Sequence, residues 1–270
     1  MLEPLYHLLR CRGISSQAKA KSLEGSTTTF VMVLDQEEHF LLSCLLGDGW
    51  LSRQSSNNFV IGICHTASQL PWLKYKAERI ASITGSKASI RPREWVTKGV
   101  VYHGYEYIAG CSKFKHLYSM LYKNNTKTFS KSLLKLLGPE AAAFFWCDDG
   151  CVHKRVRDKA NRPNPTVELQ GCLALYEPLD QAKNVSEWLF DLFNIKTWQV
   201  YHSPSDSYQV RLGGTALRTL KQHIDPYIPD CMSWKLDLSL PTQAERALIL
   251  KERAIRRQEC AATLVVDDIV

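Results

Sequence analysis

The amino-acid sequence predicts an α+β fold built from two related halves. Two apolar segments end in the same Asp-Gly pair: LLSCLLGDG at residues 41–49 and AAFFWCDDG at residues 142–150. Their aspartates, Asp48 and Asp149, are 101 residues apart (149 − 48), and a similar succession of strand-like and helix-like stretches follows each of them. A structural unit that recurs at a fixed spacing indicates a duplicated architecture.

The first half is expected to run helix, two strands, helix, two strands, helix. Four stretches rich in Val, Ile, Tyr, Phe and Trp, which favour strands, lie at residues 50–54, 57–65, 87–96 and 100–109. Between the second and third of them, residues 70–84 carry apolar side chains at helical spacing. Residues 112–125 are predicted to form a further helix.

The second half repeats this order after the second apolar segment. Strands are predicted at residues 151–156, 165–176, 196–202 and 206–213, and helices at residues 179–193 and 215–224. A short connection near residues 126–138 joins the halves. The sequence therefore divides into an N-terminal arm, two half-domains, and a C-terminal helix and tail, with predicted boundaries at 1–37, 38–130, 131–240 and 241–270.

The C-terminal segment carries a helix-start signal. Thr242 is followed three residues later by Glu245, the spacing of a capping box, so residues 242–258 are predicted to form a basic helix.

Composition favours a globular protein and leaves a polyanionic partner open. Hydrophobic residues make up 45% and charged residues 23% of the 270-residue chain, and no apolar run approaches the roughly 18 residues of a membrane span. The 34 Lys and Arg exceed the 27 Asp and Glu by seven, which is consistent with a solvated basic face and also with a polyanionic partner such as nucleic acid.

The nine cysteines are odd in number and scattered, which indicates reduced thiols in an intracellular compartment. Cys147, Cys151 and His153 are the nearest approach to a zinc cluster. Because no second pair of ligands follows at zinc-finger spacing, the sequence favours no zinc site here.

The two Asp-Gly ends predict a metal-dependent reaction. Ser43 and Gly47 are four residues apart and share one helix face, where small side chains let another helix approach closely. If both apolar helices pack together, Asp48 and Asp149 reach the same end of the pair. Two such carboxylates repel each other unless a cation lies between them, and their hard oxygens suit Mg²⁺, which can promote phosphodiester cleavage.

At this point the sequence resembles the LAGLIDADG homing endonucleases, most closely their single-chain members with two motifs. The two segments match the repeated motif, and the resemblance extends through residues 123–150 and 225–236 to cover about residues 38–240. It implies two pseudo-symmetric αββαββα half-domains with saddle-shaped antiparallel sheets. These would pack through the two motif helices and lie in the major groove of double-stranded DNA.

The resemblance also implies the site residues. Asp48 and Asp149 would bind the metal, with the preceding Gly47 and Asp148 completing the metal-binding set. Lys127 and Lys235 would act as catalytic lysines. The expected cofactor is Mg²⁺, with Mn²⁺ or Ca²⁺ able to occupy the same site.

The second motif departs from the family pattern at the helix seam. Phe144 and Asp148 stand where the family usually has small residues, whereas the first motif has Ser43 and Gly47. The packing of the two motif helices is therefore expected to be asymmetric.

Strand alternation and hairpin charge supply candidate DNA contacts. Since side chains alternate between faces, polar residues at every second position are expected to read bases. The candidates are Ser52, Arg53, Gln54, Arg91, Arg93, Lys154, Arg155, Arg157, Gln199, Gln209 and Arg211. Lys74 and Lys76 are expected to contact phosphates.

The sequence thus predicts a monomeric, site-specific double-strand DNA endonuclease. It would hydrolyse phosphodiester bonds with Mg²⁺ at a long, nearly asymmetric target and promote intron homing. An RNA maturase that binds intron RNA during splicing and a non-cleaving DNA-binding protein on the same fold are the alternatives. The protein is expected to be intracellular, and organellar if its gene lies in an organelle intron.

Overall fold

The computed structural model describes residues 34–252 except 98, 112 and 158–165, together with residue 255. These residues belong to one compact unit. Most of the predicted N-terminal arm lies outside them, and the predicted domain boundaries stay a prediction. Within the described part of the chain, no helix combines the length and apolar character that crossing a membrane requires.

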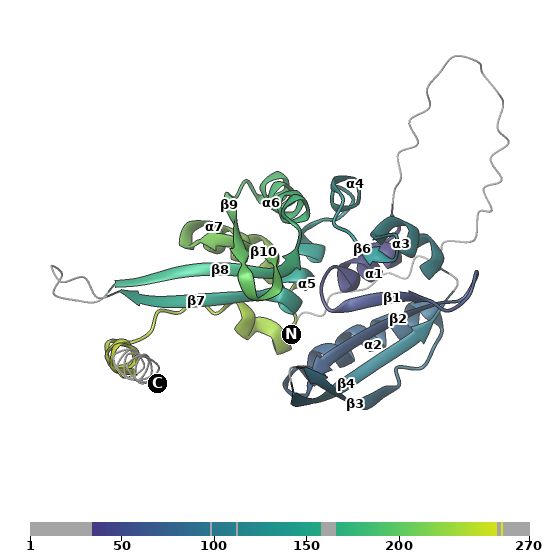
Figure 1. Ribbon diagram of the computed structural model, residues 1–270, viewed down its shortest axis with the longest axis horizontal. Coiled ribbons are helices and arrows are strands. Elements are labelled where there is room, and N and C mark those ends of the chain that lie inside the picture. The colour runs from purple at the N-terminus through teal and green to yellow at the C-terminus, as the bar shows by residue number, and fades with distance from the viewer. Residues whose placement is uncertain (1–33, 98, 112, 158–165, 253–254, 256–270) are drawn as a thin grey trace, which may run out of the picture. The chain divides into compact units, whose positions relative to one another are not determined.

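The first half forms a four-stranded antiparallel sheet with helices on one face (Figure 1). Its strands lie in the order β1-β2-β4-β3. The elements, in chain order, are α1 (Gln36–Leu46), β1 (Gly49–Arg53), β2 (Phe59–Thr66), α2 (Leu70–Thr84), β3 (Ile90–Thr97), β4 (Val100–Gly110) and α3 (Phe114–Leu121).

The second half repeats this arrangement, with strand order β7-β8-β10-β9. Its elements are α5 (Pro139–Asp149), β7 (Gly150–Arg157), β8 (Thr166–Glu177), α6 (Leu179–Phe193), β9 (Thr197–His202), β10 (Ser207–Gly213) and α7 (Gly214–Ile224). The predicted α+β class, with antiparallel sheets in two matching halves, is confirmed. Helices α2 and α6 begin and end at the predicted residues.

The predicted helix at residues 112–125 is too long, because the chain leaves it to form a hairpin. Helix α3 ends at Leu121, and the two-residue strands β5 (Tyr122–Lys123) and β6 (Thr126–Lys127) pair directly after it. Asn124 and Asn125 make the turn at φ values of 52° and 62°, a left-handed conformation that asparagine tolerates better than most residues. This hairpin carries Lys127 back toward the end of α1.

Short helices complete the unit after each half. The four-residue helix α4 (Lys131–Leu134) lies in the connection, and the 3₁₀ helices η3 (Asp225–Tyr227) and η4 (Asp230–Leu236) follow α7. Two further 3₁₀ turns are η1 (Ala67–Gln69) and η2 (Ser203–Ser205). Residues 243–252 are helical, and the predicted capping box is present: the Glu245 N–H donates to Thr242 Oγ1, and the Thr242 N–H to Glu245 Oε2.

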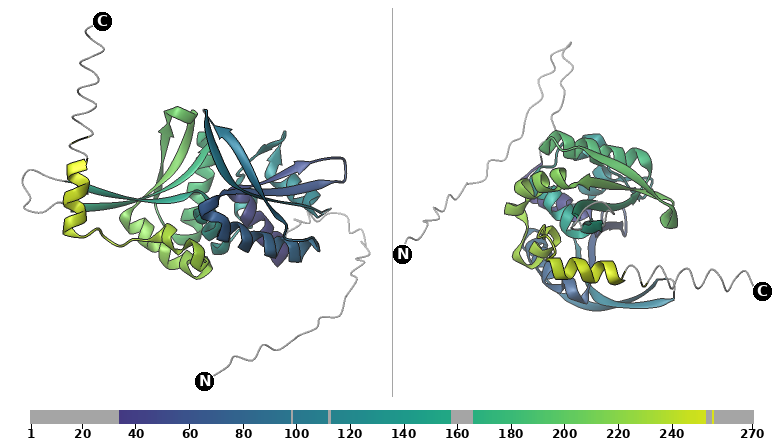
Figure 2. Two further views of the ribbon diagram at one scale, coloured as in Figure 1. Left: turned by 90° about the horizontal axis from the view of Figure 1, so that it is seen from below. Right: turned by 90° about the vertical axis from the view of Figure 1, so that its left-hand side faces the viewer.

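Each sheet keeps one face free of helices, which we call the uncovered face (Figure 2). In the first sheet, Ile61, Ile63 and Tyr107 are fully buried on the helix side. The alternate residues Cys64 and Glu106 pair with each other across β2 and β4 and therefore point to the uncovered face. The same alternation defines the uncovered face of the second sheet.

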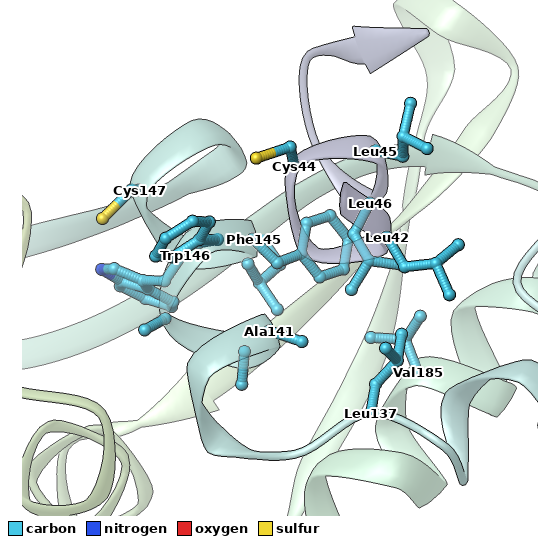
Figure 3. Packing of buried hydrophobic residues seen from close by; sticks show 14 of the residues in the cluster. Leu42, Cys44, Leu45, Leu46, Leu137, Ala141, Phe145, Trp146, Cys147 and Val185 are labelled. Atoms are coloured by element: carbon cyan, nitrogen blue, oxygen red, sulfur yellow. The ribbon is translucent and has the colours of Figure 1, made fainter. Parts of the chain in front are cut away.

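Helices α1 and α5 pack against each other at the centre of the core. Residues 40–46 of α1 and 141–148 of α5 are all buried, because each helix lies between its partner and its own sheet. Figure 3 shows the side chain of Phe145 directed toward Leu42 and Leu46 of the opposite helix. This contact joins the two halves into one core.

The seam between these helices is asymmetric, as the sequence predicts. A Cβ atom built on Gly47 would lie 2.3 Å from the Cβ of Asp148, so the space that glycine leaves on one helix is filled by aspartate from the other. Phe144 packs edge-on against Phe40 of α1 and Trp72 of α2, with ring centroids 5.5 and 5.0 Å away.

A buried ion pair accompanies this asymmetry. Lys76 Nζ lies 2.9 Å from Asp148 Oδ1, and neither side chain is exposed to solvent. The same carboxylate accepts hydrogen bonds from Trp72 Nε1 at 2.6 Å and from the Asp48 N–H at 3.1 Å. Burial alone would raise the pKa of Asp148, but Lys76, His65 and the Trp72 hydrogen bond lower it below its ordinary value.

The prediction that Lys76 contacts phosphate is therefore wrong. Its ammonium group lies in the core because a buried carboxylate needs a cationic partner there. Lys74, two residues earlier, is exposed as expected.

Replacing Phe144 with alanine should remove a central core contact. We expect Phe144→Ala to lower the free energy of unfolding by about 3–5 kcal/mol, since the ring is fully enclosed between α1 and α2. Phe190→Ala on α6 is the matched control, because that ring is 47% exposed, and it should cost less than about 1 kcal/mol. Equal losses in urea denaturation would contradict this packing.

Removing the Lys76 charge should leave Asp148 buried without a counter-charge. We expect Lys76→Met to lower the free energy of unfolding by about 3–5 kcal/mol in urea denaturation. Adding Asp148→Asn should restore part of this loss, because the double variant then has no unpaired charge at this position. Lys74→Met, on the exposed face of α2, should change stability by less than about 0.5 kcal/mol. A double variant no more stable than Lys76→Met would argue against the ion pair.

Candidate active site

Asp48 and Asp149 lie at corresponding places, where each motif helix ends and the first strand of its sheet begins. Asp48 follows α1 and its side chain is 38% exposed, while the half-buried Asp149 is the last residue of α5. Burial and the carboxylate of Asp148 raise the pKa of Asp48 to about 6. Burial, followed by the carboxylates of Asp48 and Asp148, raises the pKa of Asp149 well above its ordinary value.

Part of each rise in pKa comes from neighbouring carboxylates, so the acids at the end of the helix pair disfavour one another's ionised form. The negative ends of the helix dipoles lie at the same place and also disfavour anions. A cation placed there relieves both effects. The carboxylate oxygens of Asp48 and Asp149 are hard donors of the kind that Mg²⁺ prefers, so the residues present fit a divalent metal ion.

Lys127 and Lys235 occupy equivalent positions around the two aspartates. Lys127 Nζ donates to the carbonyl oxygens of Gly47 at 2.6 Å and Gly49 at 3.2 Å. From η4, Lys235 Nζ donates to those of Asp148 at 3.1 Å and Gly150 at 3.0 Å. Each lysine thus bridges the carbonyls on both sides of one aspartate.

Burial lowers the pKa of Lys127 despite the nearby carboxylates of Asp149, Asp148 and Asp48. The sequence predicted both lysines from motif flanks that lie far from the aspartates along the chain. The fold brings all four predicted catalytic residues to the end of the motif helices.

His65 is a neighbour of this site that the sequence analysis missed. Its ring is 1% exposed, with Nδ1 3.3 Å from Asp48 Oδ2 and Nε2 3.8 Å from Asp148 Oδ1. Among the described residues, neither ring nitrogen meets a hydrogen-bond partner at good geometry. Burial and the positive charge of Lys76 lower the pKa of His65 to about 3, so the ring is neutral at neutral pH.

His65, Asp48 and Asp148 bring their ligand atoms within 4.8 Å of one another and could together hold a metal ion. Asp148 already accepts hydrogen bonds from three groups, so its part in metal binding stays a prediction. The only sequence signal for His65 was its place at the end of an apolar strand, which is also typical of a core residue.

On the first sheet, Arg91 and Arg93 point to the uncovered face as predicted. Both guanidinium groups bond to Glu106, a buried carboxylate on the adjacent strand that the sequence analysis missed. The arginine side chains remain 66% and 46% exposed. Since a guanidinium has five N–H donors, each arginine keeps donors for a further acceptor.

The three candidate DNA contacts at the end of β1 differ in the direction of their side chains. Ser52 pairs with Val60 and shares the uncovered face, and Gln54, just past the strand, donates to Ser52 Oγ at 3.0 Å. Arg53 has the opposite parity, lies at the exposed end of the strand and donates to the Ser55 carbonyl at 3.3 Å.

On the second sheet, Gln209, Arg211 and Arg155 share the uncovered face. Arg211 pairs across the strands with Cys172, which in turn pairs with Cys151, so all three point the same way. Arg155, four residues beyond Cys151 on the same strand, is exposed on this face. Arg211 also donates to Gln209 Oε1 at 2.9 Å.

Two candidates on this sheet point the other way, contrary to prediction. Gln199 donates to Ser186 of α6 at 2.5 Å, and Lys154 bonds to Asp237 at 2.7 Å, so both lie on the helix side. The physical reason is the two-residue period of a strand, since a difference of one position reverses the face. Arg157 ends β7, and its side chain lies outside the described part of the structure.

Comparison with the structure of I-WcaI supports the fold. The homing endonuclease I-WcaI bound to its DNA recognition sequence is similar with a TM-score of 0.63 at 15% identity, covering 78% of this chain and 90% of that chain. The LAGLIDADG meganuclease I-AabMI bound to uncleaved DNA gives a TM-score of 0.46 at 12% identity, covering 74% and 87%. The chain has no significant match among curated proteins.

The family comparison covers both motifs. Residues 39–217, well over half of the chain, match the profile of the LAGLIDADG DNA endonuclease family, whose members are in general dependent on divalent metal ions. This range begins near the start of the first motif helix and includes Asp48, Lys127 and Asp149. The chain therefore belongs to the LAGLIDADG DNA endonuclease family and is an enzyme of the DNA-hydrolysing class.

Proposed function

We propose that this protein is a site-specific endonuclease that cuts both strands of DNA by Mg²⁺-dependent phosphodiester hydrolysis. One observation carries the proposal: Asp48 and Asp149 end two paired helices, and each is flanked by carbonyls that one lysine bridges. Cutting a duplex requires reaction at two phosphates, one on each strand. A chain with two equivalent acid–lysine units can serve both, so the protein acts as a monomer.

The aspartates and the lysines of the site have different chemical roles. Asp48 and Asp149 would hold the metal ion, with the preceding residues Gly47 and Asp148 as further members of the metal-binding set. When bound, Mg²⁺ supplies polarisation of the phosphate and activation of water, and Mn²⁺ or Ca²⁺ would fit the same oxygens. Lys127 and Lys235 fix the backbone around each aspartate and place positive charge near the charge that develops on the phosphate.

The uncovered faces of the sheets supply the DNA-binding surface. Arg91, Arg93, Arg155 and Arg211 lie there, and an antiparallel β-ribbon fits the major groove of DNA. I-WcaI, which is similar in fold, is described bound to its DNA recognition sequence. Many contacts along two sheets favour a long, nearly asymmetric target, because the two halves carry different side chains.

We further propose that the biological role is intron homing, in which cutting an intron-free copy of the gene promotes insertion of the intron. Such a protein acts inside the cell, and in an organelle if an organelle intron encodes it. The alternative role, binding of intron RNA during splicing, is tested by splicing assays with nuclease-inactive protein.

Substituting either motif aspartate should abolish double-strand cutting. Target sites are first selected by cleavage of a random duplex library with wild-type protein and Mg²⁺. On a selected site we expect Asp48→Asn and Asp149→Asn each to slow double-strand cleavage at least about 100-fold, equivalent to about 2.7 kcal/mol of activation free energy.

Asp191→Asn, at an exposed position on α6, is the control and should cut at the wild-type rate. Wild-type double-strand cutting by either motif variant would refute the assignment of these residues. Wild-type protein that binds DNA with Mg²⁺ and never cuts would favour the non-cleaving alternative.

Neighbouring residues on β7 should differ in their effect on DNA affinity. Arg155 points to the uncovered face, whereas Lys154 bonds to Asp237 on the helix side. We expect Arg155→Ala to weaken binding to a selected duplex and to reduce the slope of log affinity against log salt by about 1. Lys154→Ala should leave the slope unchanged. Binding is measured by fluorescence anisotropy with Ca²⁺, and the reverse order of effects would place DNA on the other face.

A further inference from the structure

Cys151, His153 and Cys172 form a second cluster of metal-ligating side chains, on the uncovered face of the second sheet. The two sulfur atoms and the imidazole ligand atom all lie within 4.8 Å of one another. Cys151 and Cys172 are direct cross-strand partners on β7 and β8, and His153 is the next residue of β7 on the same face. Both thiols are free.

The cluster shares Cys151 and His153 with the group considered from the sequence, where no zinc site was favoured, but its third member differs. Cys147, which precedes Cys151 by one helical turn in sequence, is fully buried in α5 and belongs to the core. Cys172 takes its place because strand pairing brings it opposite Cys151. The sequence alone could not identify this residue, which lies 21 positions from Cys151 (172 − 151).

The spacing of the ligand atoms fits tetrahedral zinc coordination. Cys151 Sγ lies 3.4 Å from His153 Nε2. A tetrahedral Zn²⁺ ion, with Zn–S of about 2.3 Å and Zn–N of about 2.0–2.1 Å, separates a sulfur from a nitrogen ligand by about 3.6 Å. Cys151 and His153 therefore already have the spacing that the ion requires, and the Cys172 sulfur lies within 4.8 Å of both.

The surroundings also favour a soft metal ion. Thiolate and imidazole ligands select Zn²⁺ over Mg²⁺, which prefers oxygen. Gln209 Oε1 lies 3.4 Å from Cys172 Sγ and offers a fourth donor, while water can reach the half-buried Cys151. A regular β-ladder holds both cysteines, so the site exists before metal arrives. Metal binding therefore costs little conformational entropy.

We propose that Cys151, His153 and Cys172 bind one soft divalent metal ion, of which Zn²⁺ is the best fit, at a site separate from the aspartate pair. The bound ion links β7 to β8 on the face that carries Arg155 and Arg211. This inference does not depend on the proposed nuclease function, since metal binding is measured on the protein alone.

Cobalt titration tests the site directly. Co²⁺ is added to the full chain in a phosphine reductant, which keeps the thiols reduced. We expect one equivalent of Co²⁺ to produce the near-ultraviolet charge-transfer absorption of thiolate-bound cobalt. Zn²⁺ should remove this absorption, whereas excess Mg²⁺ should not. Carboxylate-bound Co²⁺ gives no such band, so the aspartate site does not contribute.

Variants assign the band to the cluster. We expect Cys151→Ser and Cys172→Ser each to abolish the absorption, and His153→Ala to weaken Co²⁺ binding at least tenfold. Cys64→Ser is the matched control: Cys64 lies half-buried on the uncovered face of the first sheet and belongs to no metal-ligating group found among the described residues. It should retain the full band.

Three outcomes would overturn the proposal. They are absence of the charge-transfer band in the wild-type chain, an unchanged band in Cys151→Ser, and loss of the band in Cys64→Ser. Thermal melting of each variant verifies its folding. If Cys172→Ser does not fold, the half-buried Cys151 still decides the result, because its substitution disturbs no core contact.

Discussion

The close contact between the two motif helices is the constraint on which the rest of the structure depends. Gly47 leaves a space that the side chain of Asp148 fills, and this lets the ends of α1 and α5 meet. Because the first strand of each sheet begins directly after one of these ends, the same contact sets where both sheets start. The positions of Asp48 and Asp149 therefore follow from core packing.

Asp148 introduces a charge into this contact, and the surrounding residues compensate for it. A third carboxylate beside Asp48 and Asp149 increases the repulsion at the site and contributes to the raised pKa of both. Lys76 and Trp72 stabilise the ionised form of Asp148 from the core side. The two halves thus use similar backbone geometry with different electrostatics, since the first motif has glycine at the equivalent position.

The lysines show how a duplicated fold can keep its symmetry where the sequence has lost it. Lys127 comes from a β-hairpin and Lys235 from a 3₁₀ helix, yet each donates to the carbonyls on both sides of its aspartate. Backbone carbonyls are present whatever the side chain, so this anchoring survives the change from Gly47 to Asp148. The symmetry lies in the main chain.

The sequence by itself determined the order of elements, the paired aspartates and the motif flanks that carry Lys127 and Lys235, because periodicity and repeated motifs are local properties. Only the tertiary structure decided which charged groups are buried and which face each strand residue occupies. Lys76 is buried because its partner Asp148 comes from the other half of the chain. Gln199 points to the helices because strand register fixes its face, and register depends on pairing between distant segments.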